Sequence, residues 1–204
     1  MSFIFASYND YGIVMSADRR LTGYNSNGEE YILSSNNCRK LFLSRQGFAL
    51  TYTGCSSVNG APIQAKIEEF WELGNLPASL FASFAQFVNT MAGYCRENII
   101  FLAAGYENGM PKIYTATTTQ PQVQDIGELA YSGADDIAEA VLNVAPVVYD
   151  TMTLQDRIDF HRFITGTVAK YQYYSNCLQT VSEACDIVAI SKAGVVFKQF
   201  NELH

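Results

Sequence analysis

The sequence lacks the residue patterns of the common hydrolases and nucleotide-binding enzymes. It contains no GxSxG, HExxH, GxxxxGK[ST] or GxGxxG segment. A Ser-His-Asp triad would have to use His161, because the other histidine is the terminal His204, and nothing near His161 in the sequence supports a triad. Neither histidine stands at a zinc-ligand spacing from a cysteine. We therefore expect no metal and no cofactor, and we expect His161 to be a packed or solvent-tipped side chain rather than a metal ligand.

Three segments near the N-terminus carry a family pattern: GIVMSADRRLT (12–22), CRKLF (38–42) and FALTYTG (48–54). They resemble the β-type subunits of proteasomes, which belong to the N-terminal nucleophile (Ntn) hydrolase superfamily. Further segments continue the resemblance in family order: FLAAGYENGMPKIY (101–114), YSGADD (131–136) and DIVAISKAGV (186–195). A single methionine before the nucleophile is closest to bacterial proteasome-like members, including the two-component peptidases and the Anbu-type homologues.

The register of this resemblance implies a nucleophile at Ser2. Counting back from Asp18 without a gap, the catalytic N-terminal threonine of the family falls on Ser2. Lys40 matches the family's lysine, Gly54 the glycine whose backbone N–H is an oxyanion-hole donor, and Ser132 a supporting serine. The resemblance thus implies a serine in a threonine-protease type of site.

An N-terminal serine carries both a nucleophile and a base. Its α-amine has a reference pKa of about 7.7–8.0, so it can accept the hydroxyl proton near neutrality, directly or through one water. Met1 blocks that amine until it is removed, and removal is expected before a residue as small as serine. An ammonium at Lys40 would favour the alkoxide, and Asp18 would orient the lysine. Asp18 and Lys40 are also interpretable as a structural ion pair, and Gly54 as a turn residue.

Other matched positions surround the substrate site of the family. Those of the main specificity pocket fall on Leu21, Cys38, Phe42, Tyr52 and Ser56. Phe42 and Tyr52 would make that pocket narrow or partly filled, and all five residues could equally belong to the core. The backbone of Thr22 is expected to hold an extended substrate as an added strand, whereas Arg20 is interpreted as structural.

The sequence departs from the family at two positions. Ser2 replaces threonine, which keeps the hydroxyl but loses the methyl group that restricts the rotamer. The family also has an aspartate and a serine shortly before the penultimate strand, where this chain reads NCLQTVS (176–182). The aspartate is missing there, and Ser182 takes the place of the serine if the alignment shifts.

The local patterns predict strands, then two helices, strands, helices and strands. The expected strands are 2–8, 13–17, 31–33, 40–44, 48–53, 99–105, 112–116, 185–191 and 195–200, with a polar loop over 22–30. The expected helices are 62–73 and 77–95, each beginning at a proline, 135–143, and 153–173 behind a capping box.

This order indicates an α+β fold rather than alternating βαβ units. The resemblance implies a four-layer αββα sandwich, in which two stacked antiparallel sheets are flanked by helices, and we expect residues 1–204 to form one such domain. No run of residues approaches the length of a membrane span, and the first residues do not resemble a signal peptide.

The amino-acid composition indicates which classes of binding partner are expected. The net charge of −7 and the scattered Lys and Arg residues argue against nucleic acid, and no membrane partner is expected. The five cysteines form an odd set without a CxxC pair, which favours reduced thiols in the cytoplasm. The many Tyr and Phe residues favour a homo-oligomer, for which the family suggests a ring or stacked rings.

The sequence therefore predicts a cytoplasmic proteasome-like peptidase or amidase that cleaves peptides or proteins through an acyl-enzyme on Ser2. Two alternatives remain open. One is a catalytically silent proteasome-fold protein with a structural or partner-binding role, and the other is an Ntn amidohydrolase of small amides. The sequence does not identify an ATPase partner.

Overall fold

The computed structural model describes residues 2–34, 36–143, 148–175 and 177–200, and two five-stranded antiparallel sheets dominate this part of the chain. The first sheet, in spatial order, consists of β12 (Leu129–Ser132), β1 (Ile4–Asn9), β2 (Gly12–Asp18), β13 (Cys185–Ser191) and β14 (Gly194–Gln199). The second consists of β11 (Gln124–Asp125), β10 (Met110–Thr117), β9 (Ile100–Glu107), β6 (Ala49–Thr53) and β5 (Leu41–Leu43).

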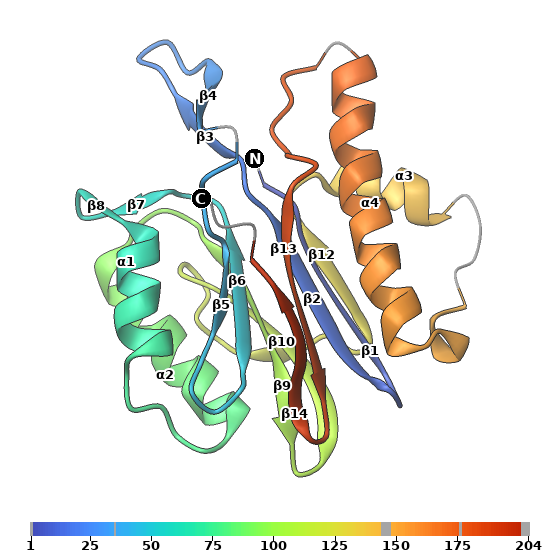
Figure 1. Cartoon of the computed structure of the whole chain (residues 1–204). Coiled ribbons are helices and arrows are strands. Elements are labelled where there is room, and N and C mark those ends of the chain that lie inside the picture. The colour runs from blue at the N-terminus through green and yellow to red at the C-terminus, as the bar shows by residue number, and fades with distance from the viewer. Residues whose placement is uncertain (1, 35, 144–147, 176, 201–204) are drawn as a thin grey trace.

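Strand β1 is buried on both faces because its alternating side chains enter two different clusters. Ile4 and Ala6 pack with residues of the second sheet, such as Leu102, between the two sheets. Phe3, just before the strand, and Phe5 point the other way, into a cluster with helix α4. The period of two in a strand produces this division. The first hairpin therefore lies at the centre of the molecule (Figure 1).

Helices cover the outer face of each sheet (Figure 1). Helix α1 (Ile63–Ile67), its π-helical continuation Glu68–Glu72 and helix α2 (Leu80–Tyr94) pack on the second sheet around Trp71. Helices α3 (Asp135–Asn143) and α4 (Leu154–Tyr174) pack on the first sheet. The described residues thus form the α+β fold with antiparallel sheets that the sequence predicts.

Two helix starts show how capping decides a boundary. Helix α4 begins as predicted, because Thr153 and Asp156 form a complete capping box. Helix α2 begins at Leu80 and not at the expected Pro77, because the Ser79 hydroxyl accepts the N–H of Ala82. A serine side chain at the N-cap accepts a backbone N–H of the first helical turn, whereas a proline side chain has no acceptor for it.

The loop predicted over residues 22–30 is wrong in its first part. Strand β3 (Leu21–Tyr24) pairs with β4 (Glu30–Ser34) in a hairpin that projects from the two sheets (Figure 1). The side chain of Asn25 closes the turn by accepting the N–H groups of Asn27 and Glu29. Because this hairpin stands outside the core, its sequence lacks the apolar alternation of a buried strand.

Smaller elements complete the chain. Strands β7 (Ser57–Val58) and β8 (Ala61–Pro62) form a second short hairpin, and a 3₁₀ turn spans Tyr149–Thr151. Within the described ranges, no helix is both long and apolar enough to cross a membrane.

A buried polar network joins the first hairpin to α4. His161 is fully buried and lies 2.8 Å from the hydroxyls of both Ser7 and Ser16. Arg157 donates to the same Ser7 hydroxyl at 2.7 Å, so that hydroxyl is available to donate to His161 Nε2. His161 then donates from Nδ1 to Ser16. Burial and the neighbouring Arg157 hold the pKa of His161 well below its ordinary value.

Acidification is expected to destabilise the fold through this histidine. The unfolded chain protonates His161 near its ordinary pKa of 6.5, whereas the folded protein keeps it neutral. The contribution of His161 to the free energy of unfolding is therefore full above about pH 6.5. Below that pH it is lost by about 1.4 kcal/mol per pH unit. Urea unfolding at about pH 7.5 and about pH 5.5 measures this difference in the free energy of unfolding.

The variant His161→Gln isolates the effect, because glutamine can form hydrogen bonds but cannot be protonated in this range. We expect its free energy of unfolding to fall less between the two pH values than that of the wild type. An equal fall in both proteins would show that His161 does not contribute.

Candidate active site

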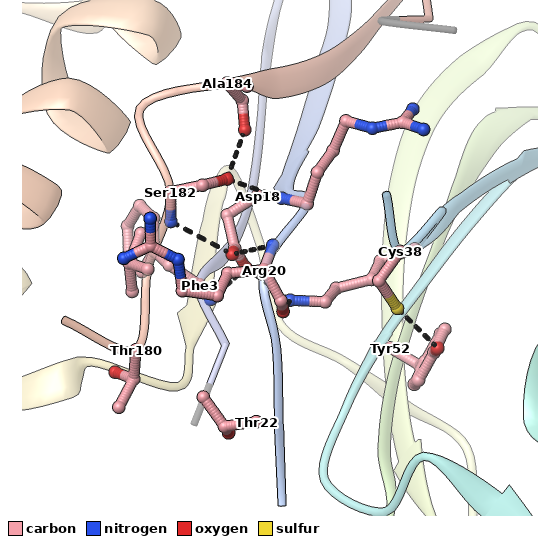
Figure 2. Close-up of polar contacts among 12 residues, drawn as sticks. Phe3, Asp18, Arg20, Thr22, Cys38, Tyr52, Thr180, Ser182 and Ala184 are labelled. Atoms are coloured by element: carbon pink, nitrogen blue, oxygen red, sulfur yellow. Dashed lines mark hydrogen bonds and ion pairs between the residues drawn. The ribbon is translucent and has the colours of Figure 1, made fainter. Parts of the chain in front are cut away.

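The carboxylate of Asp18, at the end of β2, is fully buried and accepts four hydrogen bonds. Its Oδ1 accepts from the backbone N–H of Phe3 at 2.8 Å and from Lys40 Nζ at 2.7 Å. Its Oδ2 accepts from the backbone N–H groups of Arg20 at 2.8 Å and Ser182 at 3.2 Å. Figure 2 shows the carboxylate at the point where these segments meet. Four donors stabilise a buried negative charge that would otherwise be costly.

Lys40 is also buried and comes from the second sheet, one residue before β5. Besides Asp18, its ammonium donates to the backbone oxygen of Arg20 at 2.5 Å. An ammonium has three N–H donors, and these two described acceptors use two of them. The ion pair of Lys40 with Asp18 therefore connects the two sheets and leaves one donor direction for a further group.

Ser2 is buried and lies next to the residue that Asp18 holds. Phe3 both donates its N–H to the Asp18 side chain and accepts the backbone N–H of Asp18 at 3.0 Å. Gly133 approaches Ser2 so closely that a Cβ at position 133 would lie 1.5 Å from the Ser2 carbonyl oxygen. With a φ of +120°, position 133 requires glycine. Ser132, its neighbour, pairs with Ile4 in the sheet.

The segment before β13 forms another wall of the candidate site. Besides its N–H bond to Asp18, Ser182 accepts the N–H of Arg19 at 2.9 Å and donates to the Ala184 oxygen at 2.7 Å (Figure 2). The guanidinium of Arg19 pairs with the buried Asp186 at 2.7 Å. Ser182 is thus fixed beside Asp18, while Asn176 of the same segment lies outside the described residues.

Arg20 lies on the same side of the candidate site. Its guanidinium donates to the Gln179 oxygen at 2.6 Å, and burial lowers its pKa. This contact is consistent with the structural interpretation of Arg20.

Three residues assigned to the specificity pocket lie in the core. Cys38, Phe42 and Tyr52 are buried, and Phe42 and Tyr52 belong to the cluster beneath α1 and α2. The Cys38 sulfur lies 3.7 Å from the Tyr52 hydroxyl, and Gln64 donates to it at 2.8 Å. Burial raises the pKa of both the Cys38 thiol and the Tyr52 hydroxyl. These three side chains are therefore part of the packed interior.

A cavity of about 570 Å³ opens between the β3–β4 hairpin and the segment after β6. Its lining includes Thr22, Gly54 and Ser56 of the predicted site residues, whereas Leu21 is half-buried and does not line it. Gly54 has a φ of +120°, and a Cβ there would lie 2.8 Å from the Asn98 oxygen. The glycine is therefore required by the backbone, whatever else it does.

Sequence reasoning missed two parts of this site. The segment YSGADD does not by itself assign a role to Gly133, although a glycine between a strand and a helix is a signal for positive φ or close backbone contact. Glu97, on the cavity wall, carries no sequence signal, because it enters a loop before β9 without a recognisable motif. The part of the chain that the structure describes holds no cluster of metal-ligating side chains.

Comparison with known proteins identifies the fold. No protein-family model and no curated protein matches the sequence. The Anbu (Gly-1) mutant from Hyphomicrobium sp. strain MC1 aligns with a TM-score of 0.69 and 16% identity, over 98% of this chain and 86% of that chain. Anbu (ancestral beta-subunit) from Yersinia bercovieri aligns with a TM-score of 0.64 and 14% identity, over 92% and 80%. The chain therefore has a proteasome-like fold.

Replacing Asp18 by asparagine is expected to destabilise the protein by about 3–5 kcal/mol. The variant leaves Lys40 buried without its counter-charge, and its amide turns a donor or a weaker acceptor toward the backbone N–H groups. Urea denaturation of Asp18→Asn, Lys40→Met and the double variant measures the coupling between the two residues. If Asp18→Asn lowers the free energy of unfolding by less than about 1 kcal/mol, the pair of Asp18 and Lys40 does not stabilise the fold as expected.

Proposed function

We propose that this proteasome-like chain is an Ntn hydrolase, a peptidase or amidase whose nucleophile is the Ser2 hydroxyl once Met1 has been removed. In this proposal, residues 1–204 form one domain with the four-layer αββα arrangement of that superfamily. The observation that carries the proposal is the Asp18 carboxylate, which holds the Phe3 N–H and Lys40 Nζ on a single oxygen. Met1 itself lies outside the described residues.

The bonds of Asp18 support the proposal that Ser2 is reactive. Because one oxygen of Asp18 binds both Phe3 and Lys40, the lysine ammonium is held close to the backbone that carries Ser2. In this proposal, the remaining N–H of Lys40 reaches the Ser2 hydroxyl once Met1 has been removed. A positive charge there favours the alkoxide form and keeps the α-amine neutral, which the amine requires in order to act as a base.

The reaction then follows two steps. The Ser2 Oγ attacks the carbonyl carbon of the scissile amide and passes its proton to the α-amine, while the Gly54 N–H donates to the developing oxyanion. The protonated amine gives that proton to the leaving nitrogen, the C–N bond breaks, and an acyl-enzyme remains on Ser2. Water, activated by the same amine, releases the acid and regenerates Ser2.

Neighbouring serines complete the site in this proposal. Ser182 keeps the Asp18 carboxylate oriented through its N–H, and Ser132 supports the amine side of Ser2. Thr22 aligns the substrate backbone as a strand added to β3. The fold supplies the preorganisation, because Phe3 and Lys40 each lie one residue before a strand and Ser182 is held by further hydrogen bonds.

We also propose a self-assembling, cytoplasmic protein acting on peptides or proteins. One of the similar structures bears the description "ancestral beta-subunit", which supports assembly. Exposed aromatic side chains at the C-terminal end of α4, Tyr171, Tyr173 and Tyr174, are of the kind that subunit contacts cover. The cysteines of the described residues are free thiols, as in a reducing compartment.

A second candidate function is that of a catalytically silent proteasome-fold protein with a structural or partner-binding role. The burial of Cys38, Phe42 and Tyr52 favours it, because these side chains fill the specificity pocket that the family resemblance implies. The same filling is compatible with an amidohydrolase whose substrates are small amides. Activity measurements separate these candidates.

Replacing Ser2 by alanine is expected to reduce turnover of acyl-peptide fluorogenic substrates by at least about a thousandfold, because the nucleophile is lost. The protein should be produced without a tag, and its intact mass should show that Met1 is absent. Turnover is measured as kcat/KM over a panel of short peptides and small amides.

The matched control is Ser26→Ala, which removes an exposed hydroxyl in the turn of the β3–β4 hairpin and should retain wild-type turnover. Equal activity of the wild type and Ser2→Ala would refute the assignment of the nucleophile. A retained Met1 together with no turnover of any substrate would favour the silent protein.

A further inference from the structure

We infer that the cavity beside Gly54 selects substrates with a basic side chain, lysine or arginine, through the carboxylate of Glu97. This inference rests on the proposed function, since it names the substrate class of the same site. Because Cys38, Phe42 and Tyr52 fill the pocket expected from the resemblance, the cavity of about 570 Å³ is the space left for a substrate side chain.

The position of the cavity connects it to the reaction. It lies between the β3–β4 hairpin, which contributes Thr22, and the segment after β6, which contributes Gly54. In the proposed function, these two residues hold the substrate backbone and the oxyanion. A substrate side chain that leaves the backbone between them therefore enters this cavity.

Glu97 gives the cavity its charge. It is exposed, and it is the only charged residue among the described residues that line the cavity. None of the ion pairs found within the described ranges uses its carboxylate. Most of the basic side chains in those ranges, including Arg39, Lys66 and Lys112, already pair with other acids. A negative group without a counter-charge in a concave site favours a cationic ligand.

The other walls fit the shape of lysine and arginine side chains. Tyr31 and Leu33 of β4 are 43% and 50% exposed and offer apolar surface to an aliphatic stem. The Tyr31 ring can also stabilise a cation by its π-face. Asn98 and Ser57 contribute polar groups to the same lining as Glu97. An apolar wall followed by a carboxylate matches a long stem that ends in a charge.

The surrounding groups do not neutralise this carboxylate. The Cys55 thiol lies in the same lining and donates to the Ser57 oxygen at 2.9 Å. Its pKa is raised, first by burial and further by the nearby Glu97 carboxylate, so the thiol stays protonated and uncharged. An acidic substrate side chain would meet Glu97 with like charge and would be excluded.

The test compares fluorogenic peptides that are identical except for arginine, leucine or glutamate at the cleaved residue. We expect the wild type to prefer arginine over leucine by at least about tenfold in kcat/KM, and to reject glutamate. Glu97→Gln should lower the arginine-to-leucine ratio by about tenfold. Glu97→Lys should shift the preference toward glutamate. The matched control Glu139→Gln, an exposed glutamate on α3, should keep the wild-type ratio.

A binding measurement keeps the inference testable without turnover. Chemical-shift titration of the full Ser2→Ala chain with acetyl-Ala-Ala-Arg-amide and acetyl-Ala-Ala-Leu-amide gives the two Kd values directly. We expect a Kd at least about tenfold lower for the arginine peptide, and Glu97→Gln should remove the difference. If the arginine peptide binds more tightly in this way but the wild type turns over no substrate, the proposed function is refuted, and the preference of the cavity for a basic side chain still stands. Equal Kd values for both peptides, or a preference that survives Glu97→Gln, would overturn it.

Discussion

The buried carboxylate of Asp18 is the constraint on which the arrangement of the site depends. It joins the chain start at Phe3, the β2–β3 junction at Arg20, the second sheet at Lys40 and the segment before β13 at Ser182. A charge that is fully removed from water must have such partners, because an unpaired one would cost several kcal/mol. The same requirement that stabilises the core therefore brings four distant segments to one point.

A second buried network fixes the first hairpin to helix α4. Arg157 and His161 of α4 hold the hydroxyls of Ser7 and Ser16, so the helix is fixed to the first hairpin by hydrogen bonds as well as by apolar packing. Arg157 also donates to Asn9 and to the Gly12 oxygen. The hairpin that begins with Ser2 is thus held from both faces, and a rigid strand is what a preorganised site requires.

The relation between the core and the cavity has a consequence for function. Phe42 and Tyr52 pack into the cluster beneath α1 and α2, which closes one space beside the site. The projecting β3–β4 hairpin opens another, between itself and the segments that carry Gly54 and Glu97. In the proposed function, substrate recognition therefore depends on a surface hairpin instead of on the pocket that the resemblance implies, and a surface hairpin is the element that varies most easily.

The sequence by itself determined the order of the elements, the α+β class and the capping box at Thr153, because periodicity and caps are local properties. The register to Ser2, Asp18 and Lys40 came from a resemblance, and the role of Ser2 as nucleophile stays a prediction. Only the tertiary structure decided that Asp18 bonds Phe3 and Lys40 together, that Cys38, Phe42 and Tyr52 are core residues, and that Glu97 faces a cavity. The strand β3 was missed because its side chains lie largely outside the core, where no apolar alternation is needed. Contacts between segments far apart in the chain depend on how the two sheets stack, and no local sequence pattern determines which residues of the two sheets meet.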